Sequence, residues 1–141
     1  MNCIFCEILA GKIAATFVYR DAQVAAFMDI QPVNTGHVLV VPLMHAQNLE
    51  ELSVPVGAEM FAAAQRLSRA LKSSGLRCEG VNLMLANGEA AGQEVFHVHL
   101  HVIPRFKNDG FGHKFPENYS QKPPKELLEE AGRAIRISLK G

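Results

Sequence analysis

The chain of 141 residues is long enough for one domain with a single core, and 48% of its residues are hydrophobic. Lys and Arg together number 14, as do Asp and Glu, and a formal charge of zero argues against a long nucleic acid as partner. No apolar stretch approaches the roughly 20 residues of a membrane-spanning helix, and the first residues lack a secretory signal pattern. We therefore expect a cytoplasmic protein that binds neither nucleic acid nor membrane.

The first part of the chain predicts a short helix and three strands. Ile4 to Ala10 favour a helix that Gly11 ends. Two strands, Thr16–Tyr19 and Val24–Met28, are expected to be joined by a tight turn. After a loop that contains proline and glycine, the β-branched residues of His37–Val41 predict a third strand.

The second part predicts two longer helices and two more strands. Ser53 is a suitable N-cap for a helix that ends near Gly75 and has apolar residues at helical spacing. Strands are expected over Val81–Ala86 and Val95–Ile103, and a last helix over Lys125–Leu139. The apolar residues that this last helix is expected to bury are Leu128, Ala131 and Ile135.

This order of elements predicts an α+β fold in which helices pack against one face of an antiparallel sheet. We expect a single domain over residues 1–141, which begins with the short helix at 3–10 and ends with a loop and helix at 105–141.

Three of the six histidines alternate along one predicted strand, at His97, His99 and His101. Side chains two residues apart point to the same face of a strand and lie roughly 7 Å apart. The residues between them, Val98 and Leu100, then point into a core.

Three interpretations of this stripe are open. It could be an ordinary polar sheet face, although threonine would serve that purpose better. It could be a metal site, but the outer two imidazoles begin roughly 13 Å apart, so two of them could bind one ion and all three could not. It could also support covalent catalysis, because a neutral imidazole is a good nucleophile toward phosphorus near neutral pH.

The stripe and its upstream context resemble the histidine-triad (HIT) family, whose signature is His-x-His-x-His followed by apolar residues. The resemblance covers about residues 3 to 106. The segments that carry it are 27–32, 36–42 with His45, Asn87-Gly88, Gly92-Gln93 and 97–103.

This resemblance implies a five-stranded antiparallel sheet with two main helices, paired into a homodimer with a continuous sheet. It implies a hydrolase that cleaves at the α-phosphorus of a purine nucleotide conjugate, either a nucleoside phosphoramidate or a dinucleoside polyphosphate. His99 would be the nucleophile that carries the nucleotidyl group. The remaining implied roles are phosphate contacts for His101, His37 and Gln93 with Asn87 nearby, ribose contacts for Asp29, and enclosure of the base by Ile30 and Leu39.

One position departs from the family. Many members have Ser or Thr after the Gly-Gln pair, where this chain has Glu94. A carboxylate near bound phosphate is repulsive unless it points away or is protonated, so handling of the leaving group is in question. Two other functions stay open, a nucleotide-binding regulatory protein with little turnover and a zinc-dependent hydrolase.

Cys3 and Cys6 have the spacing of one helical turn, so both thiols can face one point. A redox pair, unmetallated thiols and a zinc site are the alternatives, and zinc needs two more ligands. Some HIT proteins, described as Hint-like, and the related galactose-1-phosphate uridylyltransferases combine such a motif with two histidines. Mapped onto this chain, these are His45 and His97. The resemblance thus implies a structural zinc on Cys3, Cys6, His45 and His97.

Overall fold

The computed structural model describes residues 2–141, which form two compact units. The first ends at Gly110 and contains the sheet, and the second comprises Phe111–Gly141. The elements are α1 (Ile4–Leu9), β1 (Phe17–Arg20), β2 (Val24–Met28), β3 (Val38–Pro42), α2 (Val54–Ser73), β4 (Gly80–Met84), the short 3-10 helix η1 (Glu89–Ala91), β5 (Leu100–Arg105) and α3 (Lys125–Leu139). The assignment of 1–141 to one domain stays a prediction.

The five strands form one antiparallel sheet in the order β1-β2-β3-β5-β4. This confirms the predicted fold class. Among residues 2–141, no helix is long and apolar enough to cross a bilayer.

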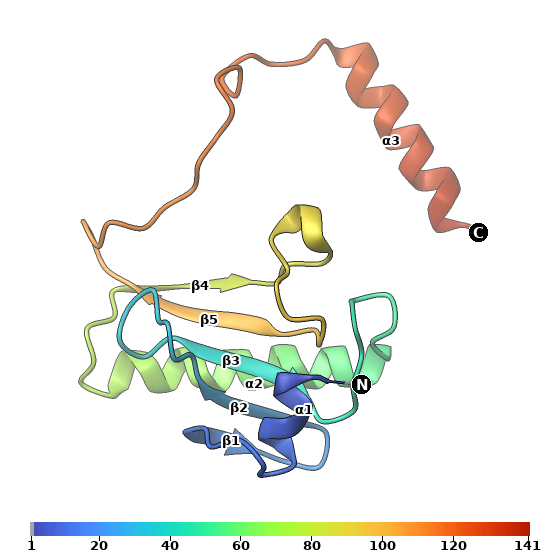
Figure 1. Cartoon of the computed structure of the whole chain (residues 1–141). Helices are drawn as coiled ribbons and strands as arrows, with labels where there is room; N and C mark the ends of the chain where they lie inside the picture. Colours follow the sequence, from blue (N-terminus) through green and yellow to red (C-terminus); the bar gives the residue numbers. More distant parts are fainter. Residues whose placement is uncertain (1) are drawn as a thin grey trace. The chain divides into compact units, whose positions relative to one another are not determined.

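Helices cover both faces of the sheet rather than the single face that was expected (Figure 1). On one face, Val38 and Val40 of β3 pack with the buried side of α2. On the other face, Leu39 and Val41 pack with Phe5 of α1. The period-two alternation of β3 therefore places one apolar set under each helix.

The helix α2 forms as its sequence predicts. Ser53 Oγ accepts a hydrogen bond from the Val56 N–H at 3.4 Å, and a proline lies in the first turn. The residues that this helix buries against the sheet are Met60, Ala63, Ala64 and Leu71.

The expected strand Val95–Ile103 is wrong at its start, because β5 begins only at Leu100. The last residue pair between β3 and β5 is Val40 with Leu100. Before it, the Val98 N–H donates to the Ala46 carbonyl at 2.8 Å, so this stretch is held by a loop and not by the sheet. His97 and His99 therefore precede the strand on which they were placed.

The helix α3 matches its predicted bounds, and the second unit by itself does not cover its apolar residues. Leu128 is 59% and Ile135 is 62% exposed, and Ala131 is also exposed. Their burial stays a prediction. An apolar stripe at helical spacing predicts an amphipathic helix, but it does not specify what covers the stripe.

Candidate functional site

The proton on His99 is located by one backbone contact. His99 is buried, and its Nδ1 lies 2.8 Å from the carbonyl oxygen of His97. Because a carbonyl can only accept, Nδ1 must carry the hydrogen, which leaves the lone pair of a neutral imidazole on Nε2. The ring of Phe5 packs edge-on against His99, with centroids 5.1 Å apart. His99 is thus held in the tautomer and orientation of a nitrogen nucleophile.

His37 and His101 form a second pair with an ordered proton. The Val33 N–H donates to His37 Nδ1 at 3.0 Å, so a neutral His37 carries its proton on Nε2. That atom lies 2.9 Å from His101 Nδ1, which accepts the hydrogen bond. A neutral His101 is left with an N–H on Nε2, which is a donor suited to a phosphate oxygen.

Burial keeps these imidazoles uncharged at neutral pH. It lowers the pKa of His99 and of His37, and Asp29, whose Oδ2 is 3.5 Å from His37 Nε2, partly opposes the effect on His37. The pKa of His101 falls to about 4, first through burial and then through the neighbouring His99 and His37. A neutral His99 is the state that nucleophilic attack requires.

Acidification is expected to destabilise the protein between about pH 6.5 and pH 4. In this window an unfolded chain protonates His101 whereas the folded chain does not, so the free energy of unfolding decreases as the pH falls. The loss from this group is up to about 3 kcal/mol. Urea unfolding at pH 7 and pH 4.5 measures it. His101→Gln should lose less stability than the wild type over the same interval, and an equal loss would contradict the assignment to His101.

Asp29 lies beside this pair. One ligand atom each from Asp29, His37 and His101 lies within 4.8 Å of the others. Asp29 Oδ1 accepts a hydrogen bond from the Gln31 N–H at 2.8 Å, and this bond shapes the loop after β2. Leu39 is buried and is paired with His101 in the sheet, whereas Ile30 is 91% exposed. Asp29 and Leu39 thus lie beside His37 and His101, whereas the Ile30 side chain is exposed.

The other two predicted phosphate residues are engaged within the chain. Gln93 Oε1 accepts from the Gly88 N–H at 2.8 Å, and its Nε2 donates to the carbonyls of Gln47 and Val95 at 2.7 and 3.1 Å. Both of its amide hydrogens are therefore used to hold this loop. Asn87 accepts from the Leu49 N–H at 2.8 Å and donates to the carboxylate of Glu50, so it also connects loops.

Four side chains predicted to hold a metal converge. His97 Nδ1 lies 3.4 Å from Cys3 Sγ, 3.6 Å from Cys6 Sγ and 3.2 Å from His45 Nδ1. Cys6 Sγ is 3.4 Å from His45 Nδ1. Zinc bond lengths of about 2.0–2.1 Å to nitrogen and about 2.3 Å to sulfur give tetrahedral edges of about 3.3 to 3.8 Å. The four ligand atoms therefore fit a tetrahedral ion.

The outer contacts of these ligands also fit a metal centre. His97 is fully buried, and its Nε2–H donates to the Pro42 carbonyl at 2.9 Å, which leaves Nδ1 as the ligand atom. Cys3 Sγ accepts from the Cys6 N–H at 3.4 Å and so caps α1. These four residues could hold a zinc ion. His97 belongs to this cluster and His101 to the cluster with Asp29 and His37, in agreement with the expectation that the three histidines cannot all bind one ion.

Glu94 is exposed. It lines a hollow of about 370 Å³ beside two of the metal-binding residues, Cys3 and His45. A carboxylate in that position is solvated, which weakens its repulsion toward phosphate.

Sequence reasoning missed several groups that build the site. The Val33 N–H and the His97 carbonyl are backbone atoms that every residue possesses, so no residue type marks them. Phe5 resembled any apolar residue of a short helix, although it contacts Phe27 and His99.

Comparison with known proteins gives one consistent family. The HIT domain model matches residues 10–108. The chain is 34% identical over 141 residues to an adenosine 5′-monophosphoramidase of Schizosaccharomyces pombe, covering 99% of this chain and 100% of the relative. A crystal structure of a HIT family protein from Bacillus anthracis has a TM-score of 0.88 at 40% identity, covering 97% of this chain and 96% of that one. A zinc-bound histidine triad family protein from Mycobacterium smegmatis has a TM-score of 0.76 at 37% identity, covering 99% and 94%.

Proposed function

Because the chain belongs to the HIT domain family, we propose that it is a nucleotidyl hydrolase that acts through a covalent intermediate on His99. Its substrate is a purine nucleotide conjugate, either a nucleoside phosphoramidate or a dinucleoside polyphosphate, cleaved at the α-phosphorus. The observation that carries this proposal is the 2.8 Å hydrogen bond from His99 Nδ1 to the His97 carbonyl, because it leaves the Nε2 lone pair for attack.

The reaction follows from the proton positions. Nε2 of His99 attacks the α-phosphorus, and the bond between phosphorus and the leaving group breaks as the leaving group takes up a proton from solvent. Water then attacks the same phosphorus and cleaves the phosphorus–nitrogen bond. Its hydroxyl stays on the nucleotide, its remaining proton returns to solvent, and His99 is restored. The Nε2–H of His101 stabilises negative charge on a phosphate oxygen, and His37 fixes His101 through their 2.9 Å contact.

The remaining parts of the site suit a nucleotide. The Asp29 carboxylate is an acceptor only and suits the two hydroxyls of a ribose. Ile30 would cover one side of the base, and Leu39 would form the apolar floor. Gln93 and Asn87 act by fixing the loops that approach the phosphate. The S. pombe relative, an adenosine 5′-monophosphoramidase, supports an AMP conjugate as substrate.

We also propose that Cys3, Cys6, His45 and His97 hold a structural zinc ion. When bound, the zinc supplies a cross-link between α1 and the residues before β5 and takes no part in the reaction. The M. smegmatis relative, described as zinc-bound, supports this proposal.

A homodimer is the third part of the proposal. The edge strand β4 has no partner on its outer side among residues 2–141, and its Leu83 and Met84 are 39% and 44% exposed. Pairing with a second copy would cover them and continue the sheet. A monomeric mass by light scattering would rule this out. A cytoplasmic location stays a prediction.

The proposed reaction predicts both a product and an adduct. The protein is incubated separately with adenosine 5′-phosphoramidate and diadenosine tetraphosphate, and released AMP is measured by chromatography. The mass of the intact protein is measured by mass spectrometry after brief mixing with each compound. We expect AMP from at least one compound and an adenylyl adduct on the protein. Binding of AMP without turnover of either compound would identify a nucleotide-binding regulatory protein instead.

A further inference from the structure

A partly buried ion pair lies beyond the proposed reacting groups, at the end of β5. The Asp109 side chain is 2% exposed and accepts from Arg105 Nε at 2.6 Å and Arg105 Nη2 at 2.8 Å. The chain turns back toward Arg105 through Asn108, whose φ of 63° is unusual for a residue other than glycine. Arg105 Nη1 also donates to Asn82 Oδ1 at 2.6 Å. Burial of the carboxylate carries a desolvation cost, so the pair need not add to the stability of the fold. The other residues that it contacts indicate which part of the structure it positions.

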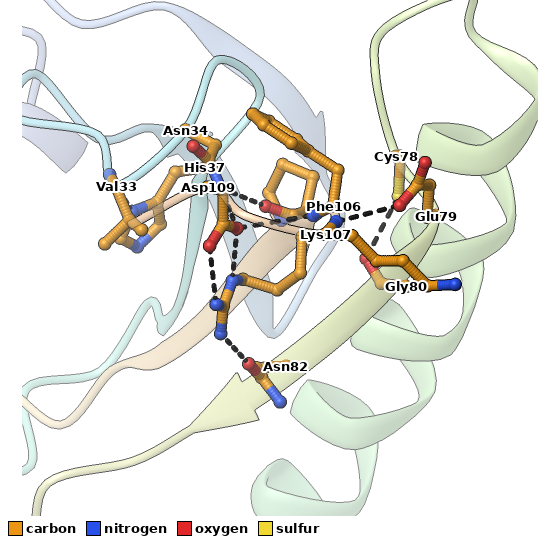
Figure 2. Close-up of polar contacts among 12 residues, drawn as sticks. Val33, Asn34, His37, Cys78, Glu79, Gly80, Asn82, Phe106, Lys107 and Asp109 are labelled. Carbon is orange, nitrogen blue, oxygen red and sulfur yellow. Dashed lines mark hydrogen bonds and ion pairs between the residues drawn. The ribbon is translucent and has the colours of Figure 1, made fainter. Parts of the chain in front are cut away.

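Asn34 connects this ion pair to the loop before β3 (Figure 2). Its Nδ2 donates to Asp109 Oδ2 at 2.8 Å and to the Pro104 carbonyl at 2.9 Å, so both amide hydrogens are used. The same loop packs closely at Gly36, whose φ is +103° and where an added Cβ would lie 3.1 Å from Leu71. Residues 33–37, which we call the His37 turn, are therefore clamped to the end of β5.

The His37 turn sets the proton on His37. The His37 N–H donates to the Asn34 carbonyl at 3.1 Å, and the Val33 N–H donates to His37 Nδ1 at 3.0 Å. If the turn moves, Nδ1 loses its donor and becomes free to carry the proton itself. The hydrogen bond from His37 Nε2 to His101 Nδ1 would then lose its hydrogen, and His101 would no longer be held with its proton on Nε2.

We infer that Asp109, held by Arg105, is a positioning residue that acts through Asn34 and the His37 turn to fix the proton on His37 Nε2 and the orientation of His101. Its effect on turnover rests on the proposed function, whereas its effect on the His37 proton does not. Asp109 and Asn34 themselves contact neither His99 nor His101 in the described hydrogen bonds. The ion pair thereby becomes part of the machinery that prepares the phosphate site.

The test uses the full-length, zinc-loaded protein with Asn34→Ala, which severs the link but keeps the Arg105–Asp109 pair. The matched control is Asn82→Ala, which removes another contact of Arg105 and leaves the His37 turn intact. Nitrogen-15 NMR of the imidazoles reports the tautomers of His37 and His101, and steady-state kinetics on adenosine 5′-phosphoramidate separate kcat from KM. Thermal melting monitors folding, and Asn34→Ser, which cannot reach both acceptors, replaces Asn34→Ala if that variant does not fold.

We expect Asn34→Ala to show protonated Nδ1 on His37 and to lose about 10- to 100-fold in kcat, as small displacements of catalytic groups do, with KM changed far less. Asn82→Ala should keep the wild-type tautomers and kcat. Wild-type tautomers in the Asn34 variant, or an equal change in both variants, would overturn the inference. A tautomer change in a protein whose wild type releases no AMP would instead overturn the proposed function and leave the positioning role standing.

Discussion

His99→Ala is expected to reduce AMP release from adenosine 5′-phosphoramidate by about 10⁴-fold or more, which is the scale seen when a covalent nucleophile is removed. The variant keeps the His37–His101 pair and its donor to phosphate, so it should still bind nucleotide. What it loses is the Nε2 lone pair that the His97 carbonyl orients. The adenylyl adduct seen by intact mass should therefore vanish while AMP binding by calorimetry changes little.

His113→Ala is the matched control, because His113 is an exposed imidazole in the second unit and its ring lies against Phe115. It should keep both the turnover and the adduct. Zinc content should be the same in the two variants, since neither changes a member of the Cys3–Cys6–His45–His97 cluster. An adduct that persists in His99→Ala would show that another residue attacks phosphorus.

The alternation of side chains along strands was the most informative part of the sequence. Along β3 this alternation puts Leu39 and Val41 with α1 on one face and Val38 and Val40 with α2 on the other. The same period gave the correct faces of β5, where Leu100 and Val102 are buried in the α2 core. These predictions succeeded because period-two patterning is local and the sheet is covered on both faces.

The start of β5 was not accessible to this reasoning. Alternation continues through His97 and His99 whether or not a neighbouring strand is present to pair with them. The ladder with β3 stops at Val40 and Leu100 although β3 continues to Pro42, because the Val98 N–H donates to the Ala46 carbonyl and the His97 side chain donates to the Pro42 carbonyl. How far one strand is paired depends on which other groups its backbone meets, and this information is held elsewhere in the chain.

The hydrogen-bond partners of polar side chains were not accessible from the sequence. The assignment of Gln93 to phosphate stays a prediction, and the structure shows its amide donating to the Gln47 and Val95 carbonyls. Asn34 lies in a segment predicted only as a loop, and it bridges Asp109 to the His37 turn. Partner choice for an amide depends on which backbone groups are left without bonds after folding, and a sequence does not display these.

Removal of zinc by Cys3→Ser is expected to lower the free energy of unfolding by about 4 kcal/mol or more, as loss of a structural metal does. The change should lower Tm by about 10 °C or more. The cluster connects residues 3 and 6 to residues 45 and 97, and Phe5 lies between the two cysteines with its ring against Phe27 and His97. Without the ion, α1 is held to the sheet by the packing of Phe5 and Ile8 and by the hydrogen bond from Arg20 Nη2 to the Leu9 carbonyl at 3.2 Å.

Cys78→Ser is the matched control, since Cys78 is half-buried, lies outside the cluster and donates only to the nearby Gly80 carbonyl at 3.3 Å in the described bonds. It should keep full zinc, measured by atomic absorption, and nearly the wild-type Tm. Cys3→Ser should still form the adenylyl adduct at a temperature where it is folded, because the His97 Nε2–H bond to Pro42 and the His97 carbonyl bond to His99 do not require the thiol. Full zinc occupancy in Cys3→Ser would refute the site. Loss of the adduct in a folded, zinc-free protein would show that the metal does more than cross-link, because the His97 carbonyl would then depend on it to hold the nucleophile.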